Sequence, residues 1–516
     1  MKTKKYGSGD YKRIYLISPR NPRNFWTLQY MVDILGYKSL MTNSAFPLLM
    51  ALTPSDVSVE YIFVDENAAT IDWNMKCDLV AITGYTLHSK RMKEIANNFR
   101  KRSIPVAMGG PHASLDPSDC EGYADHLFVG EGEIIWPQFL SDWMKGEEKS
   151  RYIQRGEINM KESPVPDWSL TKHSDYLCST VQTKRGCQYK CDFCDVIMLH
   201  GRHVRYKAID QVMDELKKIY EYGSETVFFL DDIFITSKSY TRELLGELIK
   251  WNATKKHPLS FIVQTTVEIA KDKELLQLLA DARFYQLFLG IETPRRDSLK
   301  EVHKVQNLFG DMKDSIRTIS SFGIIPIVGL MVGFDHDDDT IFDEHEKFLE
   351  DAASPITAIS VVNAPKHTPL YMKLKSEGRV IEDDLCGEWL LSTNIVPKLM
   401  TREELLDGHQ KLFKKVYELD VFEEKFINWI KEVKHPYNRD LYPLRKVRIK
   451  YNALRFMHLF THVAFKASFP MKFLFLRCIM FTIRTNKRAL RQAFNMLLQF
   501  MHFNDFVNQK TMERRS

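Results

Sequence analysis

Three cysteines stand close together in the middle of this 516-residue chain, where Cys187, Cys191 and Cys194 form a CxxxCxxC pattern. Thiolates are the usual ligands of iron–sulfur clusters. A cubane cluster has four irons, so three sulfurs at this spacing leave one iron with an open coordination position, at which a small molecule can bind. The pattern therefore predicts an open-site 4Fe–4S cluster.

Two other interpretations of the three cysteines remain open. A zinc site needs a fourth ligand, and no second CxxC or histidine pair lies near, His200 and His203 being the nearest candidates. Cysteines are also found as small core hydrophobes, which is what we expect of the single ones, namely Cys77, Cys120, Cys178, Cys386 and Cys478. This usage is typical of a reducing compartment, so a cytoplasmic location without a signal peptide is expected.

The first 150 residues alternate short apolar segments with helical patterns. Strands are predicted at 13–19, 57–66, 79–85, 105–110 and 126–132, and helices at 89–102 and 133–146. This alternation predicts a doubly wound α/β domain with helices on both faces of a parallel sheet. Ligands of such sheets bind at the carboxyl ends of the strands, which is where Thr83, Gly84, Gly109, Gly110, Gly130, Glu131 and Gly132 occur.

A second strand–helix series follows the polar segment 151–174, which is predicted to be an interdomain linker. Residues 175–390 contain six predicted strands, at 179–185, 226–235, 260–267, 285–292, 324–333 and 357–364. Six such units predict a partial (β/α)6 barrel, with the cysteines at the carboxyl end of its first strand, where barrel active sites lie. Residues 391–516 are predicted to be a helical region.

Polar or small residues recur at the ends of successive predicted barrel strands: Asp231, Asp232, Gln264, Glu292 and Gly333. Each alone is weak evidence, because Gly and Asp are common where strands end, and helix capping or a local turn explains Asp231 and Asp232 equally well. Their shared position predicts a ligand site beside the cluster. No residue is predicted to be catalytic.

The segment TKRGCQYKCDFCDVIMLHGRHVRYK resembles the cluster loop of the radical S-adenosylmethionine superfamily. The resemblance implies that the three cysteines bind three irons and that S-adenosylmethionine chelates the fourth, so that its reductive cleavage gives a 5′-deoxyadenosyl radical. It further implies that Phe193 lies against the adenine, that Asp231 and Asp232 meet the amino group of the nucleoside, and that Glu292 contacts the ribose. Gln264 and Gly333 are expected beside this site.

The amino-terminal domain lacks a GxGxxG sequence that opens a helix, which argues against a dinucleotide site. It resembles instead the cobalamin-binding domain that precedes many radical S-adenosylmethionine cores, and this implies cobalamin at the seven strand-end residues 83–84, 109–110 and 130–132. The DxHxxG motif is absent, so the cofactor is expected to have no lower histidine ligand, or the domain to be a relic without cofactor. His112 is interpreted as a turn residue.

Over roughly residues 10–400 the chain resembles the branch that contains hopanoid and bacteriochlorophyll side-chain methylases. This resemblance implies methyl transfer to an unactivated carbon of a lipophilic, polycyclic or isoprenoid-like substrate, with an electron donor such as flavodoxin or ferredoxin. Other hypotheses are a cyclase, a methylthiotransferase, or a non-catalytic membrane-associated iron–sulfur sensor. A methylthiotransferase would need a further cysteine set, which Cys77 and Cys120 do not supply.

The last 76 residues are strongly basic, with 15 Lys and Arg against 2 Asp and Glu, whereas the whole chain has a net charge of +5. They interleave Phe, Leu and Met with these cations. One interpretation is a helical cap over the barrel. Another is an interfacial helix on an anionic membrane, which would place the protein peripherally on the inner face. Nucleic-acid binding fits the charge but not the surplus of apolar residues.

Overall fold

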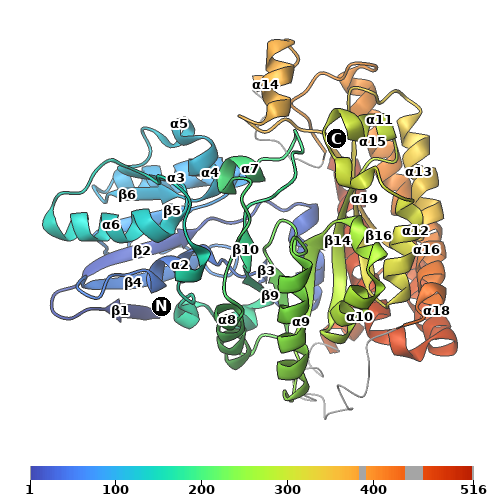
Figure 1. Cartoon of the computed structure of the whole chain (residues 1–516), viewed down its shortest axis with the longest axis horizontal. Helices are drawn as coiled ribbons and strands as arrows, with labels where there is room; N and C mark the ends of the chain where they lie inside the picture. The colour runs from blue at the N-terminus through green and yellow to red at the C-terminus, as the bar shows by residue number, and fades with distance from the viewer. Residues whose placement is uncertain (1, 383–390, 436–456, 514–516) are drawn as a thin grey trace. The chain divides into compact units, whose positions relative to one another are not determined.

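The computed structural model describes residues 2–382, 391–435 and 457–513 (Figure 1). The chain divides into two compact units. The first unit contains residues 1–23, 38–187 and 195–224, and the second contains residues 24–37, 188–194 and 225–516. This division differs from the four segments expected from the sequence, because the first strand and helix of the predicted barrel are grouped with the amino-terminal sheet.

The first unit is built on a seven-stranded sheet with the order β1-β4-β2-β5-β6-β7-β8. Its strands are β1 (Thr3–Tyr6), β2 (Lys12–Ser18), β4 (Val59–Asp65), β5 (Leu79–Thr83), β6 (Val106–Gly109), β7 (His126–Val129) and β8 (Arg151–Ile153). All neighbours pair in parallel except β1, which runs antiparallel to β4. The sheet confirms the predicted α/β class.

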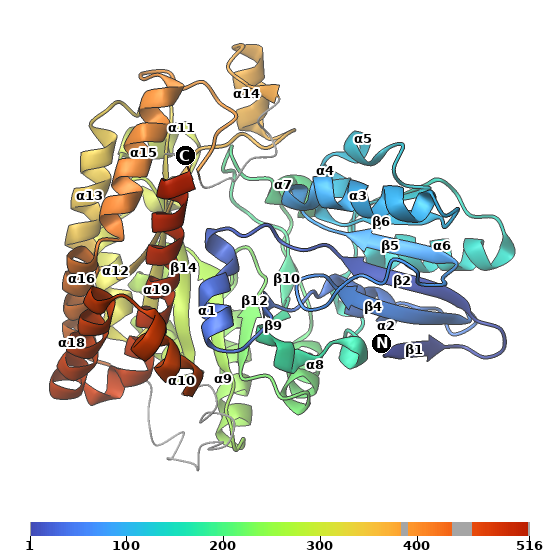
Figure 2. The ribbon, with the colours of Figure 1, turned by 180° about the vertical axis from the view of Figure 1, so that it is seen from behind.

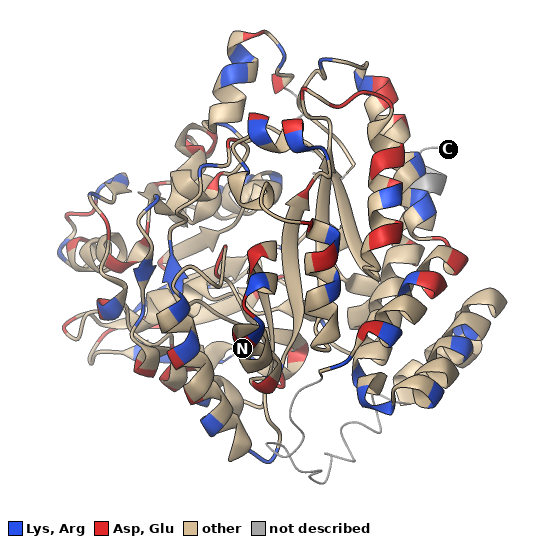
Figure 3. Cartoon of the chain, turned by 45° about the vertical axis from the view of Figure 1, so that its right-hand side comes forward, with Lys and Arg blue, Asp and Glu red and all other residues tan. Residues whose placement is uncertain are grey.

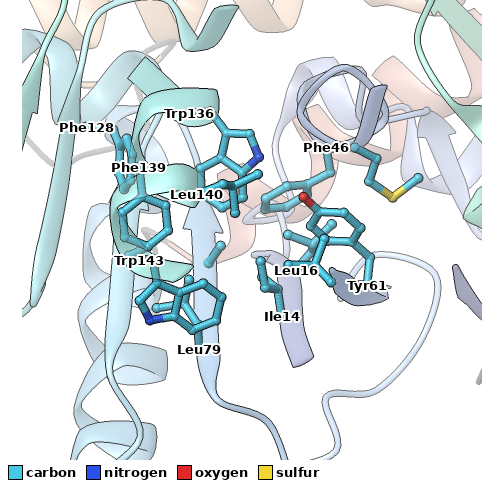
Figure 4. Close-up of a cluster of buried hydrophobic side chains, with 14 of the residues drawn as sticks. Ile14, Leu16, Phe46, Tyr61, Leu79, Phe128, Trp136, Phe139, Leu140 and Trp143 are labelled. Carbon is cyan, nitrogen blue, oxygen red and sulfur yellow. The ribbon is translucent and has the colours of Figure 1, made fainter. Parts of the chain in front are cut away.

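Both faces of this sheet are buried, which explains why its strands are nearly continuous apolar segments. In β2, Ile14 and Leu16 pack on one face with the aromatic side chains of α6 (Gly132–Lys145) (Figure 4). The alternate residues Tyr15 and Ile17 pack on the other face with α3 (Ser89–Arg100). The unit's other helices are α2 (Ala45–Ala51), α4 (Pro111–Leu115), α5 (Pro117–Cys120), α7 (Val196–His200) and α8 (Ile209–Glu221).

Residues 151–174, which were expected to be a linker, are folded into the first unit. They begin with β8, which extends the sheet. Trp168 is fully buried, and the Tyr6 hydroxyl donates a hydrogen bond of 2.5 Å to Asp167 Oδ2. The prolines at 164 and 166 therefore mark a packed irregular segment and not an open connection.

The strand expected at 179–185 is divided into two. β9 (Tyr176–Val181) pairs in parallel with β3 (Ser39–Met41), and β10 (Lys184–Arg185) pairs antiparallel with β11 (Arg205–Tyr206). The two residues between β9 and β10 belong to neither strand. The cysteine-bearing loop therefore begins from a short hairpin.

A buried ion cluster holds this hairpin to the amino-terminal sheet. Arg205 donates two hydrogen bonds of 2.8 Å to the two carboxylate oxygens of Glu131, and Arg185 lies 3.5 Å from Glu131 and 2.9 Å from Glu133. Burial alone would raise the pKa of Glu131, but the contacts with His200, Arg205 and Arg185 lower it well below its usual value. Glu131 is thus a buried anion matched by two guanidinium groups.

The second unit contains the remaining barrel strands, β12 (Thr226–Phe229), β13 (Ser260–Thr265), β14 (Phe284–Glu292), β15 (Ile325–Val332) and β16 (Ile356–Val361). Each pairs in parallel with the next. Phe229, Phe261 and Phe284 pack together, with ring centroids 5.0–5.8 Å apart. With β9, these strands are the six that the sequence predicts for a partial barrel.

The helices of the second unit follow the strand–helix alternation and then continue into the carboxyl-terminal region (Figure 1). They are α1 (Gln29–Ile34), α9 (Lys238–Ala253), α10 (Lys273–Asp281), α11 (Arg296–Glu301), α12 (Met312–Ser321), α13 (Ile341–Ala352), α14 (Pro369–Ser376), α15 (Arg402–Val416), α16 (Leu419–Glu432), α18 (Phe469–Thr485) and α19 (Leu490–Glu513). Within the described residues, no helix is long and apolar enough to cross a bilayer.

The two tail helices pack differently. α19 lies along α1 (Figure 2). Phe503 of α19 stacks on Phe25 with ring centroids 4.2 Å apart. Phe500, also in α19, stacks on Phe422 of α16 at 3.8 Å. α19 is therefore the helical cap expected from the sequence. α18 contacts α16 and α19 with one side only.

We expect Arg205→Met to destabilise the protein by about 3–5 kcal/mol, because it leaves the Glu131 carboxylate buried without its main partner. Arg151→Met is the matched control, since Arg151 forms an exposed pair with Glu121 whose loss should cost at most about 1 kcal/mol. Urea unfolding of both variants measures the difference. Equal stabilities would contradict the role given to the ion cluster, and adding Glu131→Gln to Arg205→Met should restore part of the loss.

Candidate functional site

The second half of the cysteine loop, residues 188–194, is held by hydrogen bonds within the second unit. The amide of Asp192 donates to the carbonyl of Val302 at 3.1 Å, and its carboxylate lies 2.9 Å from Nδ1 of His303. Tyr189 donates through its hydroxyl to Glu268 at 3.2 Å. The loop thus rests on the segment that follows β14 and on the segment that follows β13.

Cys191 is buried, and its Sγ accepts a hydrogen bond from Nε2 of Gln306 at 3.6 Å. Gln306 is itself buried, and its Oε1 has no hydrogen-bond partner among the described residues. The backbone amide of Cys194 donates to the carbonyl of Cys191 at 3.2 Å. Hydrogen bonds to ligand sulfurs are one of the means by which proteins tune clusters.

Cys187 lies in the first unit, two residues after β10 and within the connection between β10 and β11. The preceding Gly186 has φ of +92°, and a Cβ there would lie 2.2 Å from the carbonyl oxygen of His203, so only glycine fits. The amide of Cys187 donates to the carbonyl of Gly201 at 3.2 Å. The loop is therefore closed tightly at its start.

All three cysteines of the triad are free thiols, and Cys187 and Cys191 are buried. This donor set fits an iron–sulfur cluster. The structure places no three His, Cys, Asp or Glu side chains of the described residues around a metal position. Cys187 belongs to the first unit, and Cys191 and Cys194 belong to the second. The ligand assignment therefore rests on spacing and chemistry and stays a prediction.

Three of the six residues predicted to contact S-adenosylmethionine are brought together by Lys304 and Phe334. Lys304 Nζ lies 2.5 Å from Oε1 of Glu292 and 5.9 Å from the ring centre of Phe193. Phe334, which follows Gly333, packs against Phe193 with centroids 6.4 Å apart. Burial lowers the pKa of Lys304, but the charge and hydrogen bond of Glu292, together with the neighbouring thiols of Cys191 and Cys194, outweigh this effect and raise it. Lys304 is therefore a buried cation beside the aromatic ring.

The end of β14 has an unusual backbone. Glu292 is a non-glycine residue with φ of +65°, and the pairing of β14 with β15 shifts between Gly290 and Glu292. A Cβ at Gly290 would lie 2.5 Å from the Glu292 carboxylate. Asn307 donates hydrogen bonds of 2.8 Å to the carbonyls of Gly290 and Ile291. Strained residues of this kind are concentrated at functional sites.

Gly333 begins a turn that Asp337 holds in place. The amides of Gly333 and Phe334 donate to Oδ2 of Asp337 at 2.9 and 3.1 Å, and Ser298 donates to Oδ1 at 2.8 Å. Burial raises the pKa of Asp337 to about 6. Gly333 has φ of +109°, so the turn requires glycine at this position.

The other three predicted contact residues lie at the ends of β12 and β13. Asp231 is buried and Asp232 is half-buried directly after β12. Gln264 is half-buried within β13, and its carbonyl accepts a hydrogen bond of 2.8 Å from the amide of Phe234. The parallel pairing of β12 with β13 places both strand ends at one edge.

The glycines at the strand ends of the first sheet have close protein neighbours. A Cβ at Gly110 would lie 2.2 Å from Oγ1 of Thr83, and one at Gly84 would lie 2.9 Å from Sδ of Met92. The corresponding neighbours of Gly109, Gly130 and Gly132 are Phe128, Gln154 and Leu49. These glycines therefore allow loops of the protein to approach one another.

The same edge also presents apolar surface, because Tyr85 and Leu87, which follow β5, are largely exposed. A large flat ligand with apolar faces fits such an edge. Glu131, in contrast, is not available for a ligand in this structure, because its carboxylate is hydrogen-bonded to Arg205 and ion-paired with Arg185.

The two histidines nearest these loops are buried. His88 accepts a hydrogen bond at Nδ1 from the amide of Tyr85 at 2.9 Å, and its Nε2 lies 2.8 Å from Asn21. His112 uses Nε2 with Asp119 at 2.9 Å, while its Nδ1 has no partner among the described residues. His88 is thus fully engaged, which fits a ligand without a lower histidine.

Lys304, Gln306 and Asn307 were not predicted from the sequence. All three lie after α11 and far from the cysteines along the chain. The only available signal was the run His303–Asn307, a polar segment between two helices. Gln306 and Asn307 are nearly fully buried, whereas such a segment is ordinarily expected to be a solvated loop.

Comparison with known proteins identifies the chain. The model of the radical SAM superfamily matches residues 181–349, and that of a domain of unknown function, DUF4070, matches residues 368–515. Hopanoid C-2 methylase of Rhodopseudomonas palustris is 32% identical over 381 residues, which are 72% of this chain and 72% of that protein. Bacteriochlorophyllide d C-12(1)-methyltransferase of Chlorobaculum tepidum is 25% identical over 447 residues, 83% of this chain and 93% of that protein.

A solved structure has the same fold. The cobalamin-dependent S-adenosylmethionine radical enzyme OxsB, solved with aqua-cobalamin and S-adenosylmethionine bound, matches with a TM-score of 0.60 at 14% identity. The match covers 98% of this chain and 80% of that one. Together with the superfamily model and the 32% identity, these findings make the chain a radical S-adenosylmethionine enzyme that belongs to the family of the hopanoid and bacteriochlorophyllide methylases.

Proposed function

We propose that the protein is a cobalamin-dependent methyltransferase that methylates an unactivated carbon of a lipophilic, polycyclic or isoprenoid-like substrate. The family implies a 4Fe–4S cluster and S-adenosylmethionine. When bound, the cluster supplies the electron that cleaves S-adenosylmethionine, and cobalamin carries the methyl group. The observation that carries the proposal is the similarity over 72% of the chain to an enzyme that methylates a hopanoid.

The Lys304 group supports a nucleoside site beside the cysteine loop. Phe193 offers an aromatic face for the adenine, while Glu292 has a carboxylate oxygen bonded to Lys304 and a second oxygen that can accept from a ribose hydroxyl. The turn at Gly333 is fixed by Asp337 and leaves no side chain at the strand end. These residues bind and orient the nucleoside, and Lys304 holds the Glu292 carboxylate in place through its hydrogen bond.

The first sheet supports cobalamin binding without a protein ligand to cobalt. Its strand ends combine the exposed Tyr85 and Leu87 with half-buried glycines at 109, 110, 130 and 132. His88 has no free ring nitrogen, and no DxHxxG motif occurs. Thr83, Gly84, Gly109, Gly110, Gly130 and Gly132 remain the proposed lining, while Glu131 holds the hairpin that leads to Cys187.

Anaerobic reconstitution with iron, sulfide and cobalamin tests the reaction class. Incubation with S-adenosylmethionine and a reductant should give both 5′-deoxyadenosine and S-adenosylhomocysteine. Cys191→Ala should abolish both products, because it removes a cluster ligand, whereas Cys120→Ala, a buried single cysteine of the first unit, should retain them. If 5′-deoxyadenosine forms without S-adenosylhomocysteine and no cobalt is bound, the methyltransferase proposal is contradicted. A different radical reaction, such as ring formation, is then favoured.

The substrate class is tested by isotope transfer into the product. With a perdeuterated lipid extract as the source of substrate, deuterium should appear in 5′-deoxyadenosine, since the radical takes hydrogen from the carbon that is methylated. A perdeuterated water-soluble extract is the control and should transfer none. Transfer from the water-soluble extract alone would refute the lipophilic substrate.

Gln306 should tune the cluster as a positioning residue. Its amide donates to Cys191 Sγ, and such hydrogen bonds favour the more negatively charged, reduced cluster. We expect Gln306→Leu to make the midpoint potential more negative in an EPR-monitored redox titration. Gln286→Leu is the matched control, because Gln286 is equally buried and bonds Gln499 at 3.0 Å, away from the cysteine loop. Equal potentials in the two variants would show that the Gln306 contact has no effect.

A further inference from the structure

α18 is apolar on both of its faces, although only one of them is packed. Its buried side consists of Met471, Leu474, Cys478 and Thr482 and faces α16 and α19. On the opposite side, five large apolar side chains are 39–72% exposed: Phe469, Phe473, Leu476, Met480 and Ile483. We call these five residues the apolar stripe. The fold alone does not account for it, since a surface helix normally presents polar residues to water.

The apolar stripe is continuous along the helix. Its members are separated by four, three, four and three residues, which places them on one line over about 21 Å of helix. The short helical segment 457–466 before α18 extends the exposed surface, because Phe460 is 60% and Phe465 is 80% exposed. Contiguous exposed patches of this kind mark interaction surfaces.

The charges around the apolar stripe have one sign. Residues 457–504 contain no Asp or Glu, while Lys466, Lys472, Arg477, Arg484, Lys487 and Arg488 lie in or beside α18 (Figure 3). Arg477 pairs with Glu423 of α16 at 2.5 Å. Within the described residues the other five cations have no acidic partner at ion-pair distance, so an occupant of this surface meets a net positive charge.

Two occupants suit an apolar stripe with this spacing, a second copy of the helix or a lipid surface. In helix pairs, acidic and basic residues beside the seam form interhelical salt bridges. Two copies of α18 would bring cations against cations with no acid to pair them, which is unfavourable. An anionic bilayer offers phosphates to the cations and acyl chains to the stripe. Charge complementarity therefore favours the membrane.

We propose that α18 and the short helical segment 457–466 before it bind the surface of an anionic membrane. The helix lies in the interface, with Phe469, Phe473 and Phe465 inserted among the acyl chains and with Lys472 and Arg484 at the headgroups. α19, which packs on α1, connects this segment to the barrel. The proposal stands independently of the methyl-transfer reaction.

Flotation of the purified full-length protein with phosphatidylglycerol/phosphatidylcholine vesicles tests the proposal. The protein should bind these vesicles, should bind pure phosphatidylcholine vesicles weakly, and should dissociate as salt is raised. The triple variant Phe465→Ser/Phe469→Ser/Phe473→Ser should bind roughly tenfold or more weakly, because three inserted rings are lost. Phe309→Ser/Met372→Ser/Leu399→Ser is the control, since these side chains are equally exposed elsewhere in the second unit.

A charge variant tests the same proposal if the triple variant fails to fold. Lys472→Glu/Arg484→Glu should retain the circular dichroism spectrum and lose binding to the anionic vesicles. The proposal is overturned if the wild-type protein does not float with anionic vesicles or if the control variant loses binding equally. It is also overturned if analytical ultracentrifugation shows that the wild-type and control proteins are dimers while the phenylalanine triple variant is a monomer. In that case the apolar stripe joins two copies of the chain.

Discussion

The buried ion cluster of Glu131, Arg205 and Arg185 is the constraint on which the start of the cysteine loop depends. Two guanidinium groups and a carboxylate are removed from water together, and this is favourable only when their geometry is well matched. The paired 2.8 Å bonds of Arg205 provide that match. Because Glu131 belongs to the loop after β7 and Arg185 to the strand just before Cys187, the amino-terminal sheet fixes where the cysteine loop begins.

Within the second unit, a second ion pair, between Glu292 and Lys304, organises the end of β14. Its position follows from the backbone, because the left-handed conformation of Glu292 and the irregular pairing beside Gly290 direct the carboxylate toward Lys304. Asn307 then donates hydrogen bonds to the carbonyls of Gly290 and Ile291 at this irregularity. The strained backbone at the end of β14 and the side chains of Lys304 and Asn307 therefore act together to fix the position of the Glu292 carboxylate.

The sequence predicted the long elements well and the supporting residues poorly, for physical reasons. Strands such as β2 and β4 are buried on both faces, so continuous apolar runs with two-residue alternation reveal them within two residues at either end. The missed strand β8 is only three residues long and exposed at both ends. Lys304 and Gln306 were missed because nothing in a single sequence distinguishes a polar residue buried by tertiary contacts from one in a solvated loop. The triad was found because three thiols at that spacing have few other uses.

The basic tail shows why composition alone left two interpretations open. α18 and α19 are both rich in Phe, Leu and Met and both contain cations. α19 buries Phe500 and Phe503 against aromatic partners on other helices, whereas among the described residues no other helix supplies an aromatic partner to the apolar stripe. The cap and the interfacial helix are therefore not alternatives, because each describes a different helix. A lipophilic substrate is concentrated in the bilayer, so an enzyme that acts on one gains access to it by resting on the membrane surface. The membrane proposal and the substrate proposal thus support each other while depending on different residues.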